Sequence, residues 1–344
     1  MDLFDESRLD DPDVLSRADH VLRSLAEAGS RGRRESVEVA DAIATAVAMT
    51  KDDRPRAIVA AGPDSRLLRA VLEPSCPVPF VAWPGPGLPG WAGALDLVAM
   101  LAPDGSDAGS ARTLAEAVRR GCRVVVACPE DSLVAQHGAG RHTTLLPTTS
   151  RDQLAVAVAV LQYLSRVDLG PETDVEEVAR ALDDVASACS PHRDLSVNPA
   201  KLLAIALGDA TPLVWGGSVL AARAARRVAE ALRRSSGRSA LAGDAEHLVP
   251  VISAAPQRDV FEDPFADEEN GELRPVLVLL DDGADDPVLA EERIKLESEA
   301  ETRQVRVEHL TAEAACDVAR YAALLGQGRY AAAYLAVGLG RPGA

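Results

Sequence analysis

The residues best suited to chemistry in this chain form a glycine-rich turn, Gly216-Gly217-Ser218, which follows the apolar segment 212–215 and leads into a helical segment at 221–232. Glycines let a backbone approach a ligand closely, and a helix N-terminus offers unpaired N–H groups and a positive dipole to a phosphate. We therefore expect this turn to bind phosphate. The alternative is a tight strand-to-helix turn in which Ser218 is a simple helix cap.

Two further turns follow apolar segments, at 62–65 and 102–107. Ser65 and Ser106 supply hydroxyls there, and ligands of open α/β sheets bind at the carboxyl ends of strands. Each turn also carries carboxylates near any bound anion, and Pro63 removes an N–H donor. The carboxylates concerned are Asp64, Asp104 and Asp107. Helix capping alone would explain these residues, and a divalent metal at the second turn is the other alternative.

The elements that must position these turns alternate between short apolar strands and amphipathic helices, which predicts parallel, doubly wound sheets in two Rossmann-like halves. Strands are expected at 57–61, 78–82, 95–101, 123–127 and 143–146, and then at 212–215, 239–242, 249–252, 276–280 and 305–307. Helices are expected over 12–50 with a break at 29–32, over 66–72, 110–120 and 151–165, and after Asp174, Gly217, Asp286 and Thr311. The fold class is α/β.

The length of 344 residues suits two domains of roughly 150 residues each. The expected segments are an N-terminal helical region at 1–50, a first subdomain at 51–165, a connector helix at 166–190, and a second subdomain with a C-terminal helix at 191–344. The acidic insert 259–272 is expected to be a solvated loop.

Composition excludes several classes of partner. The 36 basic and 53 acidic residues give a net charge of −17, which opposes binding to nucleic acid. The five cysteines are scattered without a C-x-x-C pair, so we expect no disulfide framework, no metal site and a reducing cytoplasm. An acidic N-terminus and the lack of an apolar run of ~20 residues argue against a signal peptide and a membrane span. No cofactor is expected.

Three features in order carry a family resemblance: Asn198-Pro199-Ala200-Lys201, the turn at 215–218, and the arginine-containing segment 221–227. Together with the tail at 330–336 they resemble the sugar isomerase (SIS) domain proteins of the bifunctional phosphoglucose/phosphomannose isomerase family. The resemblance covers most of residues 55–340. It implies two SIS-type subdomains, a phosphosugar ligand and a homodimer.

The chain departs from that family where the chemistry should be. The family's first-half Ser-x-Ser-Gly-Asn-Thr loop matches 102–107, which keeps only Gly105 and the Ser106 hydroxyl. A carboxylate ~4 Å from a phosphate charge would cost about 4 kcal/mol at an effective dielectric of ~20. The family's catalytic Glu has no counterpart in 235–238, which contains no carboxylate.

The remaining candidates for general acid–base catalysis are Glu246, His247 and Lys201. The family's ring-opening His is followed by Asn, whereas His247 is followed by Leu248. The plainer alternative is a solvated Glu246, a His247 that begins a strand, and a Lys201 at the surface or the border of the core.

Three functions therefore stay open. The first is a phosphosugar-binding SIS protein with impaired catalysis. The second is an active aldose–ketose isomerase that interconverts fructose 6-phosphate with glucose or mannose 6-phosphate. The third is a non-catalytic interaction or regulatory protein that keeps only the fold.

Overall fold

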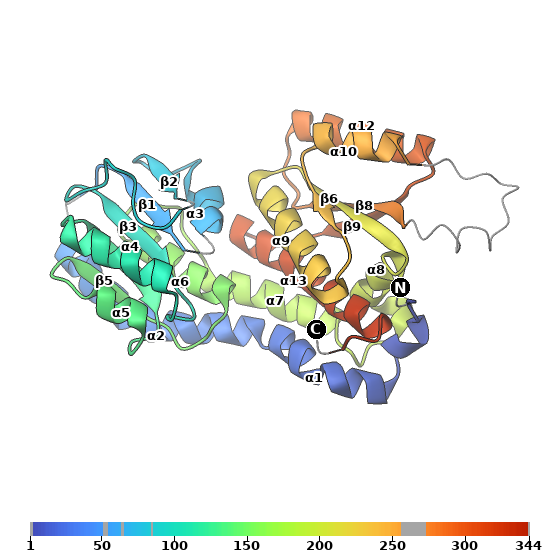
Figure 1. Ribbon diagram of the computed structural model, residues 1–344, viewed down its shortest axis with the longest axis horizontal. Coiled ribbons are helices and arrows are strands. Elements are labelled where there is room, and N and C mark those ends of the chain that lie inside the picture. The colour runs from blue at the N-terminus through green and yellow to red at the C-terminus, as the bar shows by residue number, and fades with distance from the viewer. Residues whose placement is uncertain (1–2, 51–53, 63–64, 84, 256–272, 343–344) are drawn as a thin grey trace, which may run out of the picture. The chain divides into compact units, whose positions relative to one another are not determined.

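The computed structural model describes residues 3–50, 54–62, 65–83, 85–255 and 273–342 (Figure 1). Pro63, Asp64 and the acidic insert 259–272 lie outside these ranges. The chain forms two compact units. One combines Met1–Glu27 with Ala181–Ala344, and the other comprises Ala28–Arg180. We call them the discontinuous unit and the inserted unit.

The inserted unit is built on a five-stranded, wholly parallel sheet of order β2-β1-β3-β4-β5. Its strands are β1 (Ile58–Ala61), β2 (Phe80–Ala82), β3 (Leu97–Leu101), β4 (Arg123–Cys128) and β5 (Thr143–Pro147). Every residue of β1 and β3 is buried, as expected where helices cover both faces of a parallel sheet. The five predicted strands of this half are confirmed.

The helices of the inserted unit are α2 (Ala28–Thr50), α3 (Ser65–Leu72), α4 (Ala108–Arg119), α5 (Leu133–Gly138), α6 (Gln153–Arg166) and the first part of α7 (Val175–Ala188). Helix α2 packs against α6, and α4 packs against α5. Alternate strand residues, among them Val98, Met100, Val124 and Val126, share one buried cluster with Leu114 of α4 and Val134 of α5. Because all five strands are parallel, the turns that follow them lie at the same edge of the sheet.

The discontinuous unit has a four-stranded parallel sheet of order β7-β6-β8-β9. Its strands are β6 (Ala210–Gly216), β7 (Leu241–Ala242), β8 (Arg274–Asp281) and β9 (Arg306–Thr311). Its helices are α1 (Pro12–Ala26), α8 (Pro199–Ala206), α9 (Val219–Ser236), α10 (Ala245–Ser253), α12 (Pro287–Thr302) and α13 (Asp317–Gly338), with short 3-10 turns at Glu6–Leu9 and Leu195–Val197. Helix α13 packs on α8 and α9, and α10 on α12 (Figure 1).

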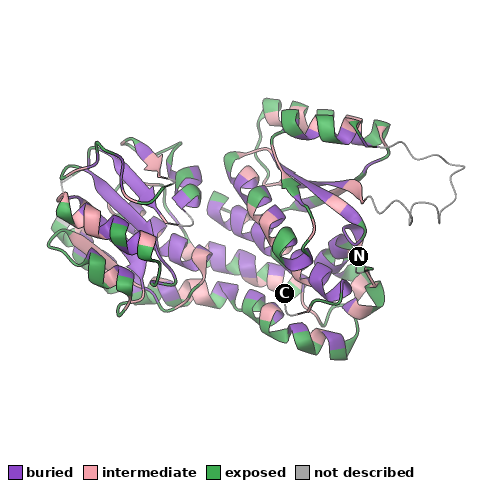
Figure 2. Cartoon of the chain, viewed as in Figure 1, coloured by how far each residue is buried: buried purple, intermediate pink, exposed green. Residues whose placement is uncertain are grey.

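Burial follows this layering. The central strands of both sheets (β1, β3, β4, β6 and β8) and most of α13 are buried, whereas the edge strands β7 and β9 and most of α12 are more exposed (Figure 2). Two similar parallel sheets with helices around them confirm the α/β, doubly wound fold class. No helix in the described ranges is long and apolar enough to cross a membrane.

Two predictions about elements are wrong. Residues 249–252 form part of helix α10 instead of a strand, because a four-residue apolar run does not distinguish the two. Leu248 and Ile252, four residues apart, both enter the buried cluster, which is the helical pattern. The helix break expected at 29–32 is also absent, since α2 runs unbroken through those residues and the chain breaks at Glu27. Helix α5 has no counterpart among the predicted elements.

Candidate ligand-binding site

The order of the strands gives each sheet one topological switch point. In the inserted unit β1 and β3 are neighbours, and the chain continues from β1 to β2 on one side and from β3 to β4 on the other. Ligands of open α/β sheets bind in the crevice beyond the carboxyl ends of such strands. Ser65 begins the helix after β1, and Ser106 lies in the turn after β3. The fold therefore brings both predicted serines to the same edge of the sheet, at its switch point.

The two strand ends approach each other closely at this switch point. Gly62 has a φ of 97°, and a Cβ added there would lie 2.2 Å from the carbonyl oxygen of Leu101. Only glycine fits such a position. Ser65 is buried and Ser106 is exposed. Of the two hydroxyls, that of Ser106 is open to solvent.

The acidic turn 102–107 serves to begin a helix. The Asp107 carboxylate accepts a hydrogen bond of 2.6 Å from the backbone N–H of Ser110 and caps α4. Hydrogen bonds from the Ser110 side chain and backbone lower the pKa of Asp107 below its ordinary value. The cap interpretation of Asp107 is confirmed. The turn after β3 consequently carries a negative charge.

The discontinuous unit has its switch point between β6 and β8. Ser218 follows β6 and caps α9, because its Oγ accepts from the N–H of Ala221 at 3.0 Å. The same hydroxyl donates to the carboxylate of Asp282, which follows β8. A Cβ on Gly216 would lie 2.3 Å from the Ala221 carbonyl, so this glycine is needed for close packing of the helix on the strand. The cap role of Ser218 is confirmed, and its proton is held by a carboxylate.

The turn at 216–218 contains a second glycine, and charged side chains lie near it. A Cβ on Gly217 would lie 2.8 Å from the Trp215 ring, so this glycine also satisfies a packing demand. The neighbouring Arg293 donates to Asp281 at 2.8 Å and is thus engaged by a carboxylate. The turn is hydroxyl-bearing and glycine-rich, as predicted, but its charge is negative.

Glu246 and His247 lie together in the first turn of α10. Their side chains are 83% and 67% exposed, and Glu246 Oε1 lies 3.8 Å from His247 Nε2. The interpretation of His247 as the start of a strand is wrong. The pair is adjacent, but in an open environment that supplies no desolvation to tune a catalytic base.

Lys201 lies elsewhere in the same unit and is fully buried. Its Nζ donates to Asp10 Oδ1 at 2.6 Å and to the carbonyls of Pro191 and Arg193 at 3.0 and 2.8 Å. An ammonium group has three donors, so all are used. No hydrogen bond or ion pair joins this described residue to Glu246 or His247. The structure therefore brings together two of the three catalytic candidates and separates the third.

The Asn-x-Ala-Lys segment that carries part of the resemblance has a structural role. Asn198 caps α8 by accepting from the N–H groups of Ala200 and Lys201, both at 3.1 Å. The Lys201 ammonium also lies 5.5 Å from the centroid of the Tyr334 ring. Asn followed by Pro is a recognisable helix start, so the cap could have been found from the sequence. Nothing in the sequence marks Asp10 as the partner of Lys201.

Comparison with known protein families gives a match for the C-terminal part of the chain. Residues 196–341 match the family described as bacterial phospho-glucose isomerase C-terminal SIS domain. This segment contains β6 to β9, the turn at 216–218 and helix α13. The resemblance to SIS-domain phosphoglucose isomerases is therefore confirmed for this half. No curated protein matches the sequence.

Solved structures extend the similarity of fold to the whole chain. Tagatose-6-phosphate ketose/aldose isomerase from Escherichia coli is 12% identical with a TM-score of 0.67, over 91% of this chain and 93% of that one. The C-terminal domain of glucosamine-fructose-6-phosphate aminotransferase from Francisella tularensis is 12% identical with a TM-score of 0.58, over 90% and 96%. A glucose-6-phosphate isomerase like protein from Thermus thermophilus is 18% identical with a TM-score of 0.51, over 89% and 92%. The chain, with one sheet in each of its two units, therefore shares the fold of these proteins.

Proposed function

We propose that this SIS-domain protein binds a phosphorylated sugar or related carbohydrate derivative and is impaired as an isomerase. One observation carries the proposal: Ser65, Ser106 and Ser218 all lie at the switch points of the two parallel sheets. Hydroxyls and helix N-termini at such positions suit a sugar phosphate. In the first sheet the ligand would contact Ser65 and Ser106. At the switch point of the second sheet, considered by itself, a ligand would contact Gly216, Gly217 and Ser218.

Impaired catalysis is supported by the state of the catalytic candidates. Isomerisation needs a base that moves a proton between two sugar carbons, held within hydrogen-bond reach of them. Glu246 and His247 are exposed, and the Lys201 ammonium group donates its three hydrogen bonds to Asp10 and to two backbone carbonyls. Carboxylates at both switch points would also weaken the hold on phosphate.

The experiment is isothermal titration calorimetry of the full chain with fructose 6-phosphate and mannose 6-phosphate, alongside a coupled isomerase assay. Binding without turnover is the expected result. Ser106→Ala removes the exposed hydroxyl and should weaken binding about fivefold, since a hydrogen bond is worth roughly 1 kcal/mol. Ser24→Ala changes an exposed serine of α1 and is the matched control. Equal affinity of the Ser106 and Ser24 variants would place the ligand elsewhere.

An active aldose–ketose isomerase is the second candidate function, favoured by the adjacency of Glu246 and His247 at the start of α10. Turnover of fructose 6-phosphate that is lost in Glu246→Gln and kept in the wild type would establish it. Such a result would overturn the proposal of impaired catalysis while leaving phosphosugar binding intact. Failure of every phosphosugar to bind would leave the interaction or regulatory protein as the remaining function.

We also propose that the protein is a cytoplasmic homodimer. The five cysteines are free thiols, which suits a reducing compartment. Light scattering coupled to size-exclusion chromatography would give the mass directly: about twice the 36.1 kDa of one chain supports the dimer, and a single-chain mass rejects it.

A further inference from the structure

A cavity of about 410 Å³ opens in the inserted unit, at the amino-terminal edge of its sheet. Leu97, Arg123 and Thr143 line it, and each is the first residue of a strand, β3, β4 and β5 respectively. Ser65 and Ser106 lie beyond the carboxyl ends of the strands. The cavity is therefore at the opposite edge of the sheet from the proposed phosphosugar turns.

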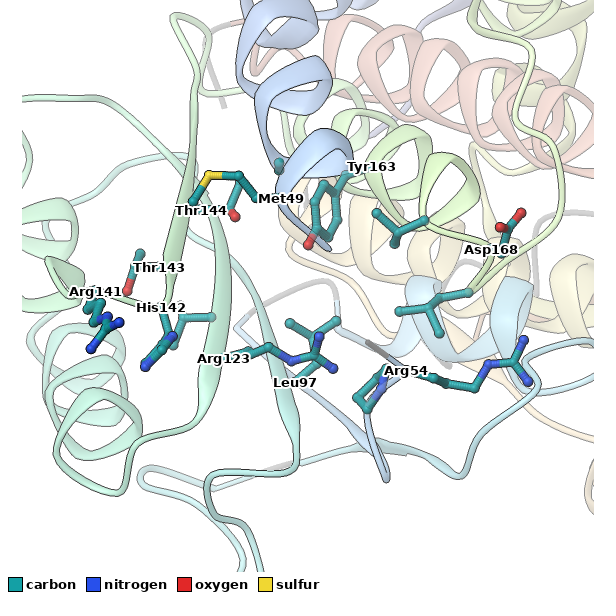
Figure 3. A pocket seen from close by; sticks show the side chains of 15 residues that line it. Met49, Arg54, Leu97, Arg123, Arg141, His142, Thr143, Thr144, Tyr163 and Asp168 are labelled. Carbon is teal, nitrogen blue, oxygen red and sulfur yellow. The ribbon is translucent and has the colours of Figure 1, made fainter. Parts of the chain in front are cut away.

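The lining of this cavity is basic. Arg54, Arg123 and Arg141 contribute guanidinium groups from three separate segments, and His142 lies beside Arg141. Figure 3 shows the Arg123 side chain between the pair Arg141 and His142 on one side and Arg54 on the other. Asp168 is the one carboxylate among the lining residues. The lining of this cavity is thus mainly basic, although the chain as a whole has a net charge of −17.

Some arginines of the inserted unit are engaged by carboxylates, whereas two of those at the cavity are not. Arg31 pairs with Asp152 at 2.7 Å and Arg56 with Asp96 at 2.6 Å. Arg54 and Arg141 make no ion pair or side-chain hydrogen bond with any residue in the described ranges. Among the residues that the structure describes, no carboxylate engages these two guanidinium groups, and both line the cavity where an external anion could bind them.

The floor and wall of the cavity offer further contacts. Tyr163 is buried, and burial raises the pKa of its hydroxyl above the ordinary value, while Thr144, which also lines the cavity, lowers it in part. Figure 3 shows the Tyr163 hydroxyl directed toward the side of the cavity that carries Arg123. Leu97 and Met49 add apolar surface. Ligand sites commonly have this composition, an apolar wall with a few polar groups, in cavities of roughly 300–1,000 Å³.

We propose that this cavity is a second anion site that takes a small molecule bearing two or more phosphate groups. Guanidinium groups bind phosphate oxygens bidentately. Three guanidinium groups from different segments suit a ligand whose charge is spread over two or more phosphates better than they suit a ligand with a single carboxylate. The site is separate from the switch-point turns, so it can stand even if the protein binds no phosphosugar.

Inorganic pyrophosphate is the probe, titrated into the full chain by calorimetry at low ionic strength. The wild type should bind it, and Arg141→Gln and Arg123→Gln should each weaken binding about tenfold or more, because a charge-assisted hydrogen bond is worth roughly 1.5–3 kcal/mol. Arg119→Gln, an exposed arginine of α4 outside the lining, is the matched control and should change affinity less than twofold. Arg141 is exposed, so its variant tests the site even if Arg123→Gln fails to fold.

Absence of pyrophosphate binding would overturn the proposal. So would equal losses in the Arg141 and Arg119 variants, which would indicate general screening of charge. Loss in Ser106→Ala with none in Arg141→Gln would place the anion at the phosphosugar turns and likewise reject the second site. A parallel titration with ADP identifies the source of the phosphates: tighter binding than pyrophosphate, lost in Arg141→Gln, assigns a nucleotide whose base uses the apolar wall.

Discussion

At the scale of single residues, the contact between Ser218 and Asp282 decides what the switch point of the discontinuous unit can bind. The serine proton is directed to the carboxylate, so the hydroxyl cannot donate to a phosphate without breaking that hydrogen bond. The carboxylate itself repels any anion placed beside it. This carboxylate therefore weakens any hold that the turn has on a phosphate.

Replacing this carboxylate should restore the turn. We expect Asp282→Asn to tighten fructose 6-phosphate binding about tenfold or more, because a like charge is removed and the Ser218 hydroxyl faces a neutral amide oxygen, a weaker acceptor than the carboxylate. Calorimetric titration measures the change, and Asp285→Asn, an exposed aspartate in the same loop, controls for net charge. Equal gains in both variants would mean that the effect is long-range and not due to the contact with Ser218.

Single-residue roles are predictable where they depend on neighbours in sequence. Ser218 and Asp107 can be recognised as helix caps because a cap contacts the N–H groups two or three residues later. The partner of Lys201 is not foreseeable, since Asp10 is 191 residues away in the chain. The order of the motifs in the sequence predicts Lys201 as a site residue. In the structure it is buried, and its hydrogen bonds connect Asp10 with the segment 191–193.

At the scale of elements, the unbroken helix α2 shows how glycine misleads. Gly29 and Gly32 predict a break, yet both lie inside the helix. A Cβ added to Gly32 would meet nothing within 4 Å. At Gly62, by contrast, the Cβ would strike the Leu101 carbonyl, and the φ is positive. Spacing in the sequence does not separate these two kinds of glycine.

The difference gives a prediction with opposite signs. Gly32→Ala should raise the free energy of unfolding by about 0.5–1 kcal/mol, because alanine loses less conformational entropy in a helix. Gly62→Ala should lower it by more than about 1 kcal/mol through strain at the end of β1. Urea denaturation of both variants checks the pair. A loss of stability in Gly32→Ala would contradict the unbroken helix.

The cap of α4 should make the stability of the inserted unit depend on pH. Since the folded state lowers the pKa of Asp107, the ionised cap contributes its full stability above the ordinary value of about 3.8 and loses it as pH falls through the lower, folded value. Asp107→Asn keeps an acceptor oxygen but removes the titration. Denaturation at pH 6 and pH 3 should show a smaller loss on acidification in the variant than in the wild type. Equal losses would exclude Asp107 as a contributor.

Strands are predicted more reliably than the details of the site, for a physical reason. A parallel strand buried on both faces must be a continuous apolar run, so β3 and β4 stand out in the sequence. The run at 249–252 is also apolar, but it lies in a helix whose core contacts recur at helical spacing, at Ala245, Leu248 and Ile252. The basic cavity escapes prediction altogether, since its arginines come from segments far apart in the chain and no local pattern joins them.

At the scale of the whole molecule, the two ends of the chain complete one unit. A Cβ added to Gly338 would lie 2.1 Å from the Phe4 ring, and one added to Gly208 would lie 2.5 Å from it, so the ring rests directly on both glycines. The N–H of Asp5 donates to the carbonyl of Gly338 at 3.0 Å. Asp10 then holds the buried Lys201. Residues 4–10 thus connect α13 with α8 and the turn that follows it.

Removing residues 2–10 should therefore destabilise the discontinuous unit selectively. We expect a loss of about 3 kcal/mol or more, because the buried Lys201 loses its carboxylate and the glycine surfaces lose the Phe4 ring. Hydrogen exchange followed by mass spectrometry should show faster exchange in α8 and α13 and unchanged exchange in β1 to β5. Uniform acceleration across both units would contradict a separate role for this segment.

The division of one unit between both ends of the chain sets the order in which the protein can mature on the ribosome. The inserted unit is complete once residue 180 has left the exit tunnel, whereas residues 1–27 must wait for α13. At ~5–20 residues per second that wait is on the order of 15–60 s. During it α1 and the 3-10 turn Glu6–Leu9 lack α13, the helix against which both pack in the finished fold. We therefore expect the apolar face of α1, which contains the buried Leu22 and Leu25, to stay uncovered by α13 until the end of synthesis.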